Sequence, residues 1–238
     1  DIIIDKSTTY NTLDTKIDTV SDKNKNNEKI YDNSKNAFFI NYNVKAAYNC
    51  CCGDGYKNNF VNMCALEKCI FAGARFLDFE IYSLNNEPII AASTANNNSI
   101  KETYNYLEMG EILKYISNNA FFHESTEAAD DPLILHFRFM STNKIIYDKT
   151  AEYLKEYLAD DLWRYTRDRD NYDADNILLR KIKYFSRRVI LIVNCFHGIN
   201  LKDTKLWEVT NMESGSNYCP LLRYNTIGGT NNSLLRNE

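Results

Sequence analysis

The sequence contains little glycine or proline and no long apolar run. It has 8 Gly and 3 Pro against 31 Asn among 238 residues. No apolar run approaches the roughly 20 residues that a membrane-spanning helix needs, and the N-terminus lacks the basic-then-apolar plan of a signal peptide. We therefore expect a soluble protein without a transmembrane segment. The asparagine bias is weak evidence of an AT-rich source. Because the first residue is Asp1 and not Met, we expect a processed product or one part of a longer polypeptide.

Basic clusters and a paired set of cysteines are also missing. The net charge is −4, and we find no cluster of cations interleaved with aromatics, so we expect no nucleic-acid or anionic-membrane partner. Seven cysteines, three of them in a row at 50–52, do not suit a disulfide framework and favour a reducing compartment, either cytoplasm or virion. Cys64 and Cys69 could join that triplet around zinc, but their spacing matches no paired ligand pattern. Buried free thiols are the favoured interpretation.

Composition divides the chain into an arm and a domain. Residues 1–36 are mostly polar, with Ile2–Ile4 as the only obvious apolar anchor, and are predicted to form an arm or linker. Residues 37–238 are predicted to form one α/β domain, with a C-terminal extension from about residue 195.

Hydrophobic periodicity predicts strands that alternate with helices. Helices are expected over 58–72, 109–121, 144–163 and 177–185, with Gly73 capping the first. Strands are expected over 38–42, 74–82, 89–92, 133–139, 188–194 and 206–209. This alternation favours a parallel sheet or barrel.

One predicted strand, at 74–82, carries two carboxylates in apolar surroundings. Its period of two places Asp78 and Glu80 on one face and Leu77 and Phe79 on the other. Buried like charges are costly unless a cation, a metal or hydrogen bonds compensate them. The strand therefore predicts a polar site in which a cation, a metal or hydrogen bonds neutralise the two carboxylates.

The order of these elements resembles a known family. The helix running into Gly73–Tyr82, then Glu87–Ile90, Asp131–Phe137 and Arg188–Leu191, resemble the X region of phosphoinositide-specific phospholipase C, in the PLC-like phosphodiesterase superfamily. The similarity covers about residues 38–194 and implies a TIM-barrel-like α/β fold. Because those residues supply about half to two-thirds of eight βα units, we expect an incomplete or distorted barrel with open strand edges.

The resemblance also implies two catalytic histidines, and the sequence lacks both. One belongs just after the first strand, near Val44, and the other after the run Glu87–Ile90, near Thr94. Losing a general base and a general acid typically removes about 10²–10⁴-fold each. We therefore expect a degenerate member with no catalytic residue at these positions. The alternative is an active phosphodiester hydrolase that uses His136 and Arg138.

The implied calcium site is altered as well. Asp78 and Glu80 stand where the family has two calcium ligands, in swapped order, while Lys45 lies near the Asn ligand and Arg138 replaces a strand carboxylate. Positive side chains oppose calcium. We expect no metal and no cofactor, and instead a vestigial polar cluster in which Arg138, with His136, pairs with the two carboxylates. For His136 itself, a satisfied core histidine is favoured over a catalytic one.

These expectations favour a protein that binds other macromolecules without turning over a substrate. A structural or protein-interaction module fits them, as a subunit of a larger assembly such as a virion, with the arm and the tail touching protein partners. Binding of a lipid headgroup is compatible with this scheme but has no support in the sequence.

Overall fold

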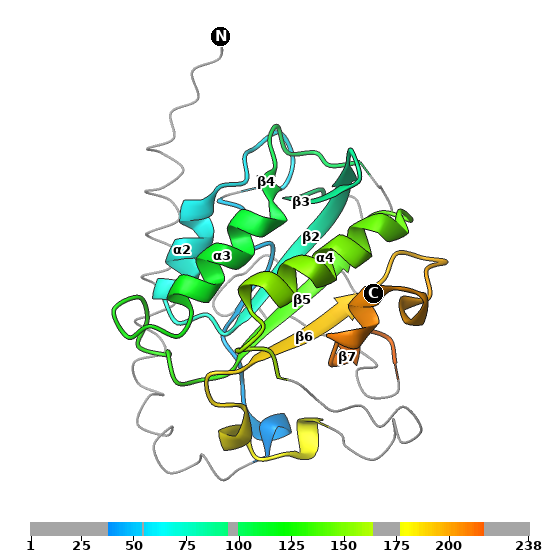
Figure 1. Ribbon diagram of the computed structural model, residues 1–238. Coiled ribbons are helices and arrows are strands. Elements are labelled where there is room, and N and C mark those ends of the chain that lie inside the picture. Colours follow the sequence, from blue (N-terminus) through cyan, green and yellow to red (C-terminus); the bar gives the residue numbers. More distant parts are fainter. Residues whose placement is uncertain (1–37, 54, 95–99, 164–176, 217–238) are drawn as a thin grey trace.

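The computed structural model describes residues 38–53, 55–94, 100–163 and 177–216 (Figure 1). The predicted arm at 1–36 and the chain after residue 216 lie outside these ranges. The division into arm, domain and extension therefore stays a prediction.

Strands and helices alternate along the described chain as expected. The strands are β1 (Ala46–Ala47), β2 (Phe76–Leu84), β3 (Glu87–Ala91), β4 (Leu107–Glu108), β5 (Leu133–Phe139), β6 (Val189–Asn194) and β7 (Met212–Glu213). The α-helices are α2 (Met63–Phe71), α3 (Met109–Asn119) and α4 (Lys144–Tyr157). Short 3₁₀ turns are η2 (Phe39–Asn41), η3 (Ile177–Leu179), η4 (Ile182–Phe185), η5 (Leu201–Asp203) and η6 (Lys205–Glu208).

The strands form one mixed sheet that does not close on itself within the described residues. Its order is β4-β3-β2-β5-β6-β7, with β1 pairing the beginning of β2. The strands β1, β5 and β6 run parallel to their neighbours, as does β7, whereas β3 and β4 are antiparallel. The α/β, TIM-barrel-like arrangement with an incomplete barrel agrees with the sequence prediction.

The three α-helices cover one face of this sheet (Figure 1). That face is apolar, because alternate strand residues such as Leu77, Phe79 and Phe137 point into one core with the helices. Phe79 and Phe137 meet edge to face with ring centroids 5.7 Å apart. Among the described residues, no helix combines the length and the apolar character needed to cross a bilayer.

The other face of the sheet, called the inner face here, changes character along its strands. Near the beginning of the strands it is apolar, with Phe76, Ile134 and Ile190 in register and packed against η2 and η4. Two residues further along each strand the side chains become polar on β2 and β5. This half of the inner face carries the candidate site.

The predicted helix cap at Gly73 is confirmed, and a tight turn follows β2. Gly73 ends α2 with a φ of +77°, a conformation that favours glycine, and its N–H bonds the carbonyl oxygen of Ile70. Asn85 and Asn86, both with positive φ, form the two-residue turn that joins β2 to β3. Because this tight turn fixes the hairpin register, it sets which β3 residues lie beside the acidic strand.

Several predicted elements are wrong in type or length. The expected helix at 177–185 is two 3₁₀ turns, because only Ile177 and Phe185 are buried there and no apolar stripe runs between them. The expected strand at 38–42 is mostly η2, and the expected strand at 206–209 coincides largely with η6. Near η6, the hydroxyls of Thr204 and Thr210 donate to nearby carbonyl oxygens, which stabilises turns over extended chain. The helices predicted over 58–72, 109–121 and 144–163 are shorter than expected.

The stretch after β6 contributes to the core. Leu201 and Leu206 are fully buried in the helix-side core, and β7 pairs with Ile192 and Val193 of β6. Residues 195–216 therefore extend the sheet beyond β6.

Candidate functional site

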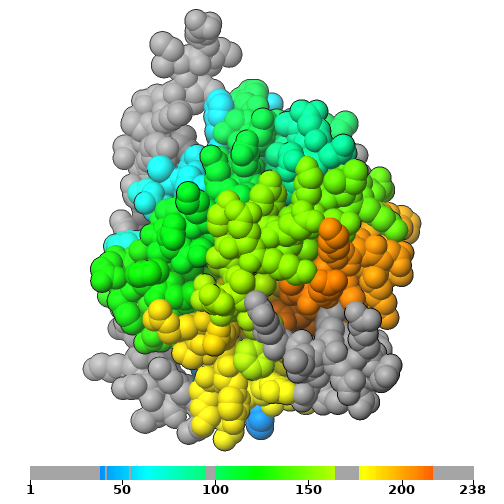
Figure 2. Space-filling view, viewed as in Figure 1, coloured from blue at the N-terminus to red at the C-terminus, as the bar shows by residue number. Residues whose placement is uncertain are grey.

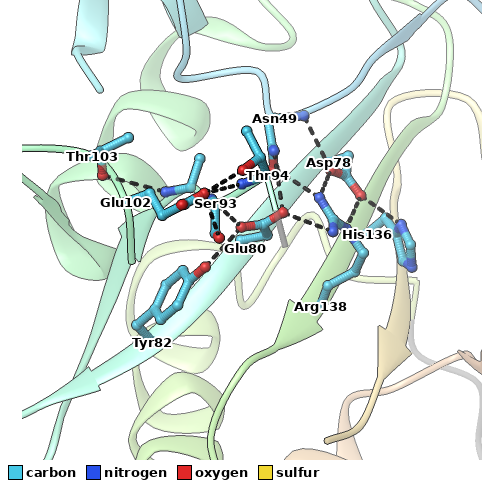
Figure 3. Close-up of polar contacts among 11 residues, drawn as sticks. Asn49, Asp78, Glu80, Tyr82, Ser93, Thr94, Glu102, Thr103, His136 and Arg138 are labelled. Atoms are coloured by element: carbon cyan, nitrogen blue, oxygen red, sulfur yellow. Dashed lines mark hydrogen bonds and ion pairs between the residues drawn. The ribbon is translucent and has the colours of Figure 1, made fainter. Parts of the chain in front are cut away.

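Strand register brings the four predicted polar residues together on the inner face. Asp78 of β2 lies opposite His136 of β5, and Glu80 lies opposite Arg138. The four side chains converge in Figure 3, and the two carboxylates are almost fully buried. A parallel pair of strands in this register puts both carboxylates within reach of one guanidinium.

Arg138 bridges the two carboxylates. Its Nε and Nη2 donate to the two oxygens of Asp78 at 2.9 and 2.7 Å, and its Nη1 donates to Glu80 Oε1 at 2.9 Å. This bidentate geometry is the strong form of an arginine–carboxylate pair. The ion pairs that the sequence predicted between Arg138 and the two acids are therefore present.

His136 forms a further hydrogen bond with Asp78. Its Nδ1 lies 2.8 Å from Asp78 Oδ2, and the ring is 3% exposed. Burial alone would raise the pKa of Asp78, but the charge of Arg138 and the hydrogen bond from His136 outweigh it and hold that pKa well below its usual range. Asp78 is therefore ionised at neutral pH.

Three residues that sequence reasoning missed complete the cluster. The backbone N–H of Asn49 donates to Asp78 at 3.0 Å, and its side chain donates to Glu80 at 3.2 Å and accepts from Arg138 at 2.8 Å. The Tyr82 hydroxyl and the Ser93 N–H each donate to Glu80 Oε2 at 2.9 Å. Asn49 follows β1 closely and Ser93 follows β3 closely, so their places at strand ends were the available signal.

The structure shows what surrounds the position near Val44, where the resemblance implies the first histidine. Val44 precedes β1 and packs beside the apolar inner-face cluster of Phe76 and Ile134. The residue that directly follows β1 is Tyr48, whose ring lies 4.5 Å from the Arg138 guanidinium carbon. Neither Val44 nor Tyr48 is a histidine.

Lys45 and Thr94 contact groups other than the two carboxylates of the cluster. The Lys45 ammonium donates to the carbonyl oxygen of Ala72, and Asn49 is the residue that reaches the carboxylates from this part of the chain. Thr94 is exposed, and both its N–H and its hydroxyl bond the carboxylate of Glu102. Those hydrogen bonds lower the pKa of Glu102 to about 2.

The acidic residues do not fit a calcium ion. Each of the four carboxylate oxygens of Asp78 and Glu80 already accepts two hydrogen bonds, from Arg138, His136, Asn49, Tyr82 and Ser93. Calcium prefers six or more oxygen ligands, whereas the guanidinium between these carboxylates is a cation itself. These carboxylate oxygens are therefore not available to a calcium ion.

The cysteines in the described ranges are thiols. All six are free, and Cys50 and Cys51, which follow Asn49 in the sequence, are buried. Burial raises the pKa of Cys69 to about 12, which keeps it protonated. Within the described residues, no group of three or more His, Cys, Asp and Glu side chains is arranged to hold a metal ion.

Comparisons with known proteins identify the class of fold. No protein-family model matches the sequence, and no curated protein matches it. Among solved structures, PLC21 of S. officinalis aligns with a TM-score of 0.55 and 14% identity over 71% of this chain and 20% of that one. PLC21 of L. pealei aligns with a TM-score of 0.55 and 13% identity, over 71% of this chain and 20% of that one. A calcium-dependent phosphoinositol-specific phospholipase C from a Pseudomonas species aligns with a TM-score of 0.43 and 12% identity, over 68% of this chain and 59% of that one.

The similarity at these identities concerns the fold alone. The described domain has the TIM-barrel-like fold of phospholipase C structures, as the sequence resemblance predicted. The chain spans about a fifth of the length of the two PLC21 structures.

Proposed function

We propose that this chain is a phospholipase C-like domain that has lost phosphodiester cleavage and serves as a structural or protein-interaction module of a larger assembly. The observation that carries the proposal is Arg138, which takes up the acidic side chains by bridging Asp78 and Glu80. A guanidinium remains charged in proteins, so it can neutralise these acids but cannot exchange protons with a substrate.

The strand ends also argue against acid–base chemistry. The positions near Val44 and Thr94, where the resemblance calls for histidines, carry none, and the residues that directly follow β1 and β3 are Tyr48 and Ala92. An unperturbed phenol titrates near pH 10 and an alanine side chain does not titrate. His136, the histidine within the cluster, is buried against Asp78. These observations favour a positioning role for His136 over a catalytic one.

The unclosed sheet favours a partner. Among the described strands, β1, β4 and β7 are two residues each and bound the sheet. Short edges restrict pairing with other chains, but an unclosed barrel leaves backbone groups that a neighbouring segment can bond. A larger assembly would supply such a segment. The suggestion that it is a virion rests on the asparagine-rich composition.

A hydrolysis assay tests the loss of activity. We would incubate the full chain with phosphatidylinositol vesicles and with a soluble inositol phosphodiester, with and without calcium, beside an active calcium-dependent enzyme. We expect no turnover above background in either condition. Turnover by the native chain that disappears in His136→Ala or Arg138→Met would instead establish the alternative hydrolase.

A charge-reversing variant tests why activity is absent. Arg138→Glu replaces the cation by a third carboxylate beside Asp78, Glu80 and Asn49, which creates an oxygen-rich set suited to calcium. We expect millimolar calcium to raise the unfolding temperature of Arg138→Glu and to leave that of the native chain unchanged. Specific micromolar calcium binding by the native chain in calorimetry would contradict the proposal.

A further inference from the structure

A carboxylate outside the buried cluster shares one residue with it. That residue is Ser93, which follows β3 and is 7% exposed. Its backbone N–H donates to Glu80 Oε2 at 2.9 Å, and its hydroxyl donates to Glu102 Oε2 at 3.0 Å. Figure 3 shows these contacts as a continuous series from Glu102 through Ser93 to Glu80. Ser93 is therefore held by two carboxylates, one from the acidic strand and one from the segment that precedes β4.

The side chain of Glu102 fixes the chain that follows β3. Its Oε2 also accepts from the N–H of Thr94 at 2.6 Å and from the Thr94 hydroxyl, and its Oε1 lies 3.3 Å from Lys57 Nζ. Hydrogen bonds to an ionised carboxylate are roughly twice as strong as those between neutral groups. The place of Ser93 beside Glu80 therefore depends on Glu102.

The backbone of Glu102 is held independently of its side chain. Its N–H donates to the carbonyl oxygen of Ala92 at 2.9 Å, and its own carbonyl oxygen accepts from the Asn58 N–H at 3.1 Å. In Figure 2, residues near 60 (cyan) and residues of the segment before β4 (green) lie side by side at the upper end of the molecule. A substitution of the Glu102 side chain should therefore remove its contacts with Ser93 and leave this segment in place.

The contacts of Glu102 are more exposed than those of Glu80. The side chains of Glu102 and Lys57 are 21% and 59% exposed, whereas that of Glu80 is 4% exposed. Because water competes for exposed hydrogen bonds and ion pairs, they break at a lower free energy than buried ones. Of the donors to Glu80, the one that depends on Glu102 should therefore be lost first.

We propose that Glu102 controls a local opening of the buried cluster. While its carboxylate holds Ser93 and Thr94, the Ser93 N–H stays on Glu80. When these outer contacts break, Ser93 moves away and water takes its place on Glu80, while Arg138 stays bound to both acids of the cluster. A change at the surface can then reach the cluster without unfolding of the sheet. This inference goes beyond the proposed function and does not depend on it.

Amide hydrogen exchange of the full chain, followed by NMR, tests the opening. Ser93 is the informative amide, because its acceptor is Glu80 and not Glu102. In the native chain, we expect the Ser93 amide to exchange at a rate that low urea concentrations do not change, whereas amides of β5 follow global unfolding. Glu102→Ala should speed Ser93 exchange roughly 10- to 100-fold. Glu102→Gln keeps one acceptor oxygen without the charge and should give a smaller increase.

The matched control removes a carboxylate on the other side of the sheet. Glu152 of α4 pairs with Lys205 at 2.7 Å, and Glu152→Ala should leave Ser93 exchange unchanged. Ser93 exchange in Glu102→Ala that is no faster than in Glu152→Ala overturns the proposal, and Glu102→Gln serves for this comparison if Glu102→Ala does not fold. An equal increase at Phe137 of β5 also overturns it, because the whole fold would then have weakened. So does native Ser93 exchange that follows global unfolding.

Discussion

The ion cluster inside the sheet and the ion pairs along α4 use the same chemistry in different surroundings. In the cluster, the side chain of Asp78 has no exposed surface and that of Arg138 is 12% exposed. On α4, Lys155 pairs with Glu208 at 2.6 Å, but their side chains are 47% and 58% exposed. Distance therefore does not distinguish the two sites, whereas access to water does.

The difference shows that a buried charge stabilises the fold only while all of its partners are present. Water around Lys155 can solvate either partner if the other is removed, so the net gain from the pair is small. Around Asp78, protein groups replace water, and the loss of one group leaves another charge uncompensated. The buried cluster should therefore respond strongly to single changes, and the surface pair weakly.

Removal of the central cation should give the largest effect. Arg138→Met keeps much of the side-chain volume but leaves Asp78 and Glu80 buried side by side without their cation. We expect a loss of about 3–5 kcal/mol in the free energy of unfolding, measured by urea denaturation at pH 7. A loss below about 1 kcal/mol would mean that water already reaches the cluster.

Acid should remove part of the same stability. The folded-state pKa of Asp78 lies below the unfolded value of about 3.9, so its contribution is fully present above about pH 5. As pH falls from there toward the folded pKa, the unfolded state takes up the proton first and stability falls. We expect a loss of about 2 kcal/mol from this group by the lowest pH at which the fold persists.

The pH experiment needs a matched variant at each site. Urea unfolding at a series of pH values should show that Asp78→Asn lacks this acid loss, while the surface variant Glu208→Gln retains it. If the free energy of unfolding changes with pH in the same way for the native chain and Asp78→Asn, the pKa of Asp78 is not lowered in the folded state.

Sequence reasoning predicted the acidic strand and its partners because a period of two and strand order determine them. Two clearly alternating strands carry the polar residues of the cluster. Their parallel register places Asp78 opposite His136 and Glu80 opposite Arg138. Asn49 could not be predicted in the same way, because it follows a two-residue strand and has a positive φ of 46°. Its role depends on long-range packing that no local pattern records.

The 3₁₀ turns at 177–185 were not predicted, for a related reason. Residues 177–185 have enough apolar content for a helix, but only Ile177 and Phe185 find buried positions. Which apolar residues point inward depends on the bridge between Phe38 and Lys181, far apart in the chain. Local periodicity therefore predicts the strands of the sheet. The orientation of the residues at the two ends of these strands depends on tertiary contacts and could not be predicted from it.

Replacing the whole cluster should cost less than breaking it. Asp78→Asn/Glu80→Gln/Arg138→Met removes all three charges together and leaves neutral amides that still accept from His136, Tyr82 and Ser93. We expect the triple variant to lie within about 1–2 kcal/mol of the native chain, and so to be more stable than Arg138→Met alone. If the triple variant is the less stable one, the cluster stabilises the fold beyond mutual neutralisation.

The surface pair should give the smallest effect. Lys155→Met removes the cation from Glu208, and water can solvate the remaining carboxylate, so we expect a change of about 0.5 kcal/mol or less in the free energy of unfolding. Because Arg138→Met and Lys155→Met both replace a cation with the same apolar residue, the ratio of their effects measures the contribution of burial. Similar values for the two variants would mean that water screens both sites alike, and would remove the basis for separating the buried cluster from the surface pairs.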